Sequence, residues 1–141
     1  MFSFWLPPGL QQIDEDEIGI DSYPGTFQDS TANSTVFRIG FDYGRWGGGI
    51  AEERHYYVCR SVDTTTIAGK KAIVGRFKFE PEYPHWEYRL EVVFPIDRPF
   101  PLSLWDSVTG QSNEERLFMY ANCPRRAECA VARGVFRSVE F

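Results

Sequence analysis

The sequence predicts a single all-β domain, an antiparallel β-sandwich or barrel of about seven or eight short strands with an extended N-terminal arm. Three observations lead to this prediction. Segments that alternate apolar and polar residues recur every ~8–14 residues, with turn residues between them. Aromatic residues make up 16% of the chain, and they favour the half-buried surface of a sheet. A chain of 141 residues also fits one domain whose core needs neither metal nor disulfide.

Residues 1–35 are expected to form the extended acidic arm, and residues 36–141 the β domain. The arm contains six carboxylates and no Lys or Arg, whereas the other 106 residues contain 15 basic and 14 acidic side chains. One short strand is expected near Ile18–Ile20. Because the body is near neutral, it lacks the basic stripe that nucleic acid requires, so no nucleic-acid partner is expected. The acidic run comprises Asp14, Glu15, Asp16 and Glu17. It is either a solvated segment or an element that docks on a basic partner.

The clearest element is a hairpin between residues 72 and 95. Both arms alternate with the period of two of a half-buried strand, and Pro81 and Pro84 interrupt the ladder between them. The polar positions carry opposite charges on the two arms, Arg76 and Lys78 on the first, Glu87 and Glu91 on the second. If these charges face one another, each well-placed pair favours antiparallel pairing by roughly 0.2–1 kcal/mol.

The remaining elements are assigned from short runs of β-branched and aromatic residues. Strands are expected over residues 36–43, 55–62, 102–106, 116–121 and 130–141. Turns are expected at residues 63–66 and 68–70, and the glycine-rich segment 44–49 is expected to form a loop. Helix is expected to be limited to a turn or two around residues 49–55 or 112–116.

The cysteines allow one local disulfide. Cys123 and Cys129 lie six positions apart around a Pro-Arg-Arg turn, and a hairpin there would bring their Cβ atoms within the ~4 Å that a disulfide requires. In a reducing compartment the alternative is three free thiols, with Cys59 as the third. A zinc site is not expected, because a Cys-x5-Cys spacing is not that of a zinc knuckle.

No residue pattern predicts catalysis, a metal site or a cofactor. His55 and Cys59 on one strand would lie about 13 Å apart, too far for a hydrogen bond. The glycine-rich loop lacks the Lys-Ser/Thr that follows in a phosphate-binding loop. No apolar run reaches the ~18 residues of a membrane helix, and the first residues lack the basic region of a signal peptide. These absences predict a protein that is not an enzyme, has no membrane partner and resides in the cytoplasm or a virion.

The most informative side chains are large apolar residues outside the predicted strands. Four of them lie at the N-terminus, namely Phe2, Phe4, Trp5 and Leu6. Four more lie in or beside predicted loops, namely Trp46, Tyr83, Trp86 and Trp105. Aromatic side chains next to Gly, Pro and Arg are typical anchors of protein interfaces. The alternative is that they cap the ends of the protein's own core.

The sequence therefore predicts a non-catalytic structural or accessory subunit that packs into a larger protein assembly, for example a virion decoration or tail component. Its arm and aromatic loops would make the contacts, in a homo- or hetero-oligomer. The alternative is a small acidic inhibitor or immunity-type protein whose residues 14–17 mask a basic site on a partner. A third possibility is a β-barrel enzyme or small-ligand carrier with a cavity lined by Tyr56, Phe77 and Tyr88.

Overall fold

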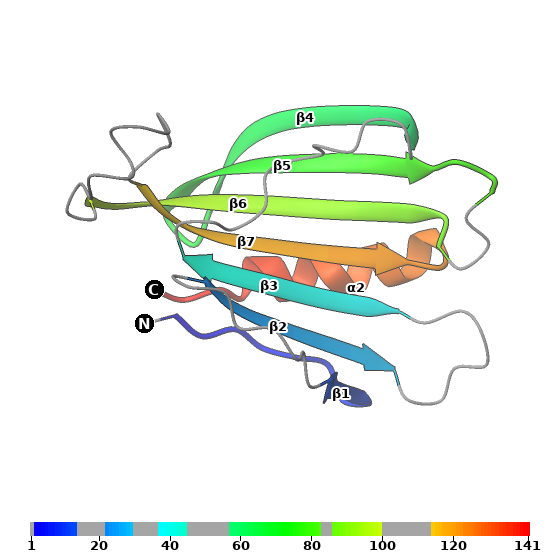
Figure 1. Cartoon of the computed structure of the whole chain (residues 1–141), viewed down its shortest axis with the longest axis horizontal. Helices are drawn as coiled ribbons and strands as arrows, with labels where there is room; N and C mark the ends of the chain where they lie inside the picture. The colour runs from blue at the N-terminus through cyan, green and yellow to red at the C-terminus, as the bar shows by residue number, and fades with distance from the viewer. Residues whose placement is uncertain (1, 14–21, 30–36, 45–56, 83–85, 100–113) are drawn as a thin grey trace.

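One antiparallel sheet organises the chain in the computed structural model, which describes residues 2–13, 22–29, 37–44, 57–82, 86–99 and 114–141. Seven strands follow the spatial order β1-β2-β3-β7-β6-β5-β4 (Figure 1). They are β1 (Leu10–Ile13), β2 (Ser22–Asp29), β3 (Arg38–Gly44), β4 (Tyr57–Ile67), β5 (Lys70–Phe79), β6 (Tyr88–Pro99) and β7 (Glu114–Cys123). The last strand in sequence, β7, pairs with both β3 and β6. The sheet stays open, with β1 and β4 as its outermost strands.

The prediction of an all-β fold built from antiparallel strands is confirmed. One helix, α2 (Arg126–Arg137), accompanies the sheet and lies against one of its faces (Figure 1). The main core lies between this helix and the central strands. Its largest fully buried side chains include Phe94, Ile39, Leu117, Met119, Val92, Val135 and Val139. Each such side chain stabilises the fold by roughly 1.5–3 kcal/mol through its burial.

The prediction of a final strand over residues 130–141 is wrong, because α2 occupies most of that segment. The buried helical residues Cys129, Ala132, Val135 and Phe136 recur at steps of three or four, which is the period of a helix rather than a strand. Ala, Arg and Glu, which are good helix formers, supply most of the other positions. Glu128 in the first turn and Arg137 in the last turn also have the charges that the helix dipole favours.

The predicted hairpin is confirmed, since β5 and β6 pair antiparallel, but its expected charge pairing is wrong. Arg76 lies across from Leu90, and Phe77 lies across from Arg89. Because side chains alternate between the two faces, Arg76 and Lys78 share the helix-covered face with Leu90. The carboxylate of Glu91 lies on the opposite face. The observed register differs by one residue from the register in which these charges would face one another, so the two sets lie on opposite faces of the sheet.

The turn predicted at residues 63–66 is also wrong, because these residues lie inside the 11-residue strand β4. The chain reverses instead at Ala68–Gly69, within the second predicted turn. Both residues have positive φ, 50° for Ala68 and 75° for Gly69. Two consecutive residues with positive φ are typical of the tight turns whose twist matches that of paired strands.

The N-terminal segment contributes two strands to the same sheet. β1 pairs with β2, and β2 pairs along its length with β3. Within the described residues the pairing of β1 with β2 ends at Ile13 and Thr26, so Pro24 is paired there with β3 alone, across from Asp42. The expected strands near 18–20 and at 102–106 and the glycine-rich loop at 44–49 lie outside the described residues.

The structure joins Cys123 to Cys129 in a disulfide, with 5.5 Å between their Cα atoms. The flanking segments are the end of β7 and the first turns of α2, and not the two strands of a hairpin as expected. Both residues are buried in the core. The bond thus fixes the start of the helix against the strand on which it packs.

Candidate functional site

Three of the predicted N-terminal interface residues pack on the protein's own core. Phe2, Phe4 and Leu6 are partly buried against it. The ring of Phe2 lies 5.4 Å from that of Phe41, in an edge-on arrangement. Trp5 alternates with them and is 56% exposed, so it is the large apolar side chain that this segment presents to solvent. The prediction of an intermolecular contact here therefore depends on Trp5.

Trp86 is half-buried rather than fully exposed. Its ring lies 6.1 Å from that of Phe79, and the guanidinium of Arg38 lies 5.5 Å from its centre. It therefore packs within this subunit. The other predicted interface residues lie outside the described residues, namely Asp14, Glu15, Asp16, Glu17, Trp46, Tyr83 and Trp105.

The edge strand β4 presents a long strip of backbone at one side of the sheet (Figure 1). Within the described residues it pairs with β5 alone, so alternate N–H and C=O groups along 11 residues point away from the sheet. The opposite edge strand, β1, has only 4 residues. Natural edges are usually protected by shortness, Pro, charged side chains or bulges. β4 contains neither Pro nor Lys, but it carries Arg60 and Asp63 and has an irregular register between Tyr57 and Cys59. It also exposes Val58 and Val62.

A basic groove lies beside β4, between the strands β4–β6 and the helix. It consists of two adjoining cavities of about 300 and 270 Å³, which share Arg76, Leu90 and Arg133. Its strand residues include Ser61, Asp63, Thr65, Ile67, Arg76, Lys78, Tyr88 and Leu90, and its helix residues are Arg126, Cys129, Arg133, Phe136 and Arg137. The helix residues follow steps of three, four, three and one, which place them along one side of α2.

Six basic residues border the two cavities, but Arg89 directs its guanidinium to Glu91 on the opposite face, which leaves five cations at the groove. Two carboxylates accompany them, that of Asp63 and, beside Tyr88, that of Glu87. The carboxylate of Asp63 pairs with Arg76 at 2.7 Å. Within the described part of the chain, no salt bridge involves the other four cations, which are Lys78, Arg126, Arg133 and Arg137. The groove is therefore locally positive on a chain whose formal net charge is −5. Such a concave cluster attracts anions.

Tyr88 marks the end of the groove near the start of α2. A hydrogen bond to the Glu87 carboxylate raises the pKa of its hydroxyl, and partial burial and the Glu87 charge add to this effect. Arg126 lies close enough to oppose the shift. The hydroxyl is thus kept protonated, so this part of the groove has a neutral hydrogen-bonding group among the cations.

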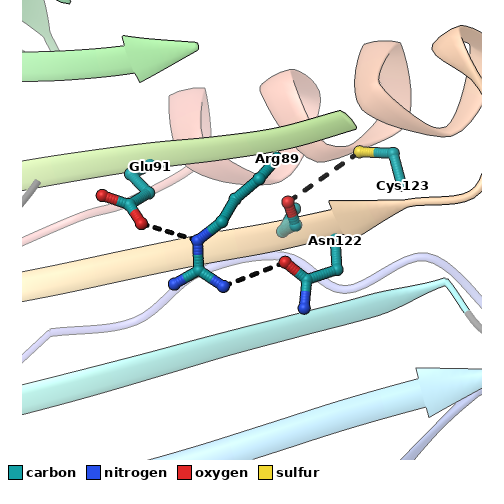
Figure 2. A network of polar contacts seen from close by, with 5 residues as sticks. Arg89, Glu91, Asn122 and Cys123 are labelled. Atoms are coloured by element: carbon teal, nitrogen blue, oxygen red, sulfur yellow. Dashed lines mark hydrogen bonds and ion pairs between the residues drawn. The ribbon is translucent and has the colours of Figure 1, made fainter. Parts of the chain in front are cut away.

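A buried polar network occupies the opposite face of the sheet (Figure 2). The guanidinium of Arg89 donates to Glu91 Oε1 at 2.6 Å and to Asn122 Oδ1 at 2.9 Å. It also lies 4.4 Å from the centre of the Tyr120 ring. Glu91 is 2% exposed, so this ion pair is shielded from water. In Figure 2 these side chains converge in front of the strands, with α2 behind.

This network fixes strands together. Arg89 and Glu91 come from β6, and Asn122 and Tyr120 from β7. Gly40 on β3 lies directly under the Tyr120 ring, where a Cβ atom would overlap the ring carbons. Figure 2 also marks a 4.0 Å contact between Cys123 Sγ and the Ala121 carbonyl. The disulfide sulfur carries no hydrogen, so this contact is not a hydrogen bond.

The described residues show no arrangement suited to catalysis or metal binding. No group of three His, Cys, Asp or Glu side chains among them could hold a metal ion. His55 and His85 both lie outside the described ranges. Of the residues expected to line a ligand cavity, Phe77 and Tyr88 both border the 270 Å³ cavity, although their side chains lie on opposite faces of the sheet, and Tyr56 is not described. Among the described helices, none is long and apolar enough to cross a membrane.

Comparisons with protein-family models, curated proteins and solved structures found no significant match. The geometry described above is therefore the basis for any functional proposal.

The basic groove is the feature that sequence reasoning missed. The Arg residues at positions 126, 133 and 137 are separated by steps of seven and four, which indicates one side of a helix. That signal is visible only if the segment is read as a helix. The contribution of Arg76 and Lys78 additionally depends on the pairing register of β5 and β6.

Proposed function

We propose that this protein is a non-catalytic subunit of a larger protein assembly, and that copies associate through the edge of β4. The observation that carries the proposal is the length and exposure of this edge. A partner strand placed there would receive hydrogen bonds from alternate residues along β4. The exposed Val62 beside that edge would add apolar contact area. The short strand β1 offers much less backbone at the other edge.

The test is the mass in solution, measured by light scattering over a concentration series. We expect the full-length protein to exceed the monomer mass of 16.3 kDa, increasingly so at higher concentration. Val62→Lys should reduce the mass to that of the monomer, because a charged side chain beside the edge opposes strand addition. Val131→Lys is the matched control, since Val131 on α2 is 41% exposed and Val62 is 42% exposed. This variant should behave as the unmodified protein does.

A deletion of residues 1–35 is a poor test of assembly, because it would also remove β1 and β2 from the sheet. Substitution at single exposed positions leaves the sheet intact. A full-length protein that stays at 16.3 kDa at every concentration would contradict self-association. The acidic inhibitor would then become the leading candidate, and a basic partner protein would be sought.

A further inference from the structure

We infer that the basic groove binds the acidic run of a second copy of this chain, residues Asp14 to Glu17. This inference names a second contact of the proposed assembly and rests on it. The groove and the run have opposite charges within a single sequence. Four successive carboxylates in one copy face five cations that border the groove in another. Only one of those cations, Arg76, is paired within the described residues, with Asp63.

The shape of the groove suits an extended acidic segment. Arg126 and Arg137 are 11 residues apart on α2, so their Cα atoms are separated by about 16 Å along the helix axis. Arg133 lies between them and borders both cavities. Four residues in extended conformation span about 10 Å between their first and last Cα atoms. The run therefore fits within the row of cations, with room for the side chains at both ends.

The floor of the groove is apolar and aromatic. Leu90 borders both cavities, Phe136 borders one and Tyr88 the other. Ile13 and Ile18 flank the acidic run in the sequence. An extended segment with carboxylates between apolar residues can thus meet cations and apolar surface together. A single phosphate would engage only part of such a row.

The run cannot reach the far side of the groove of its own chain, which β5 forms. Residues 14–21 join the end of β1 to the start of β2, so both ends of this segment are fixed at one edge of the sheet. Nine peptide steps fixed at both ends extend at most about 16 Å outward. Strand β5, which carries Arg76 and Lys78, lies four or five inter-strand steps away, about 19–24 Å across the sheet, whereas β6 on the near side of the groove lies three or four steps away, about 14–19 Å. A second copy, unlike the run of the same chain, can therefore reach the cations of β5 together with those of α2.

The first test measures binding of a peptide to the full-length protein. A fluorescein-labelled peptide of residues 10–21 is titrated at low salt and followed by fluorescence anisotropy. A control peptide replaces Asp14, Glu15, Asp16 and Glu17 with the corresponding amides. We expect the acidic peptide to bind and the amide peptide to bind at least about tenfold more weakly, because charge attraction supplies the affinity. Added salt should weaken binding of the acidic peptide through screening.

The groove is tested by a matched pair of charge reversals. Arg133→Glu should weaken peptide binding about tenfold or more, because it replaces an attraction with a repulsion at the centre of the groove. Lys71→Glu makes the same change in net charge at an exposed position on the other face of β5, and should leave binding unchanged. No binding of the acidic peptide, or equal binding to both variants, would overturn the inference.

The second test uses mixing of two full-length variants in light scattering. One carries Arg133→Glu, and the other carries the four amide substitutions in residues 14–17. If the groove binds the run of another copy, a 1:1 mixture should associate through one intact groove and one intact run, and each variant alone should lack this contact. An assembly that persists in both variants but is lost in Val62→Lys would refute the groove contact and support the proposed function. Loss of the assembly in Arg133→Glu, with no effect of Val62→Lys, would support the groove contact and refute association through the edge of β4.

Discussion

The backbone N–H of Trp5 donates a hydrogen bond to Ser138 Oγ over 2.8 Å, joining the first residues of the chain to the end of the helix. The same hydroxyl donates to the Val135 carbonyl at 2.7 Å, in the last turn of α2. Two residues away on each side, Ser3 and Glu140 exchange two backbone hydrogen bonds of 2.8 and 2.9 Å. The two ends of the chain are therefore fixed to each other beside the core.

Ser138→Ala should destabilise the protein by about 1–2 kcal/mol, because it removes both hydrogen bonds of the hydroxyl and leaves the Trp5 N–H without this acceptor. The measurement is the free energy of unfolding from urea titration. Ser61→Ala on β4, where the side chain is exposed, is the control and should change stability by less than about 0.5 kcal/mol. Equal effects of the two changes would show that the Ser138 hydroxyl does not support the terminal contact.

Gly40→Ala should destabilise the protein by about 1–3 kcal/mol, because the added Cβ overlaps the Tyr120 ring and forces it from its place beside Arg89. Gly134→Ala provides the matched comparison, since no atom outside its own helix surroundings lies within 4 Å of the added Cβ. In the interior of a helix this change should stabilise by about 0.5–1 kcal/mol. Thermal unfolding should therefore shift in opposite directions for the two variants.

Arg89→Met should lower the free energy of unfolding by about 3–5 kcal/mol, because it leaves the buried Glu91 carboxylate without this counter-charge. The double variant Arg89→Met with Glu91→Leu should lose less than the single variant, since it removes the buried charge as well. Denaturant titration of both variants and of Glu91→Leu completes a double-mutant cycle. Additive losses would mean that the ion pair is energetically unimportant.

The ion pair between Arg125 and Glu128 should give stability a weak pH dependence. Burial opposes ionisation of Glu128, but hydrogen bonding and charge from Arg125, together with backbone hydrogen bonds, hold its pKa below the ordinary value of 4.5. A lowered folded-state pKa means that the contribution is complete above pH 4.5 and is lost as the pH falls through the lowered value. Glu128→Gln should therefore be slightly less stable than the unmodified protein near pH 7.

This difference should be small, because the Arg125 side chain is largely solvated and the pair is screened by salt. It should disappear at the acid end of a pH series of thermal unfolding curves. A constant difference from pH 7 down to pH 2 would exclude ionisation of Glu128 as its source.

The strands were more predictable from the sequence than their pairing. β5, β6 and β7 follow clear patterns of aromatic and β-branched residues, and all three were expected close to where they occur. In β5, however, both faces of the strand carry apolar residues. Phe77 and Phe79 suggest that their face covers the main core, yet Val74 and Ala72 on the other face pack under the helix. Periodicity alone does not decide which face is inward when both are partly apolar.

The helix and the N-terminal strands were missed for different reasons. Val131, Val135 and Val139 lie in the segment predicted as a strand, although their spacing of four is also that of a helix. β1 is too short to show periodicity, and Pro24 and Gly25 interrupt the pattern of β2. The candidate site depends on the helix and on which face of β5 turns toward it. Its cations converge only when α2 is a helix and Arg76 lies on the helix side of β5.

The position of β7 between β3 and β6 has a consequence for how the chain folds. Gly40 pairs with Tyr120, which is 80 positions later in the sequence. Strands β1–β3 and β4–β6 can each form from local contacts during synthesis, but they remain separate until β7 is made. Contacts so distant in sequence slow the folding transition. Until β7 is inserted, β3 and β6 would each have an unpaired edge. Newly made chains should therefore be prone to aggregation at this stage, and a chaperone should reduce it.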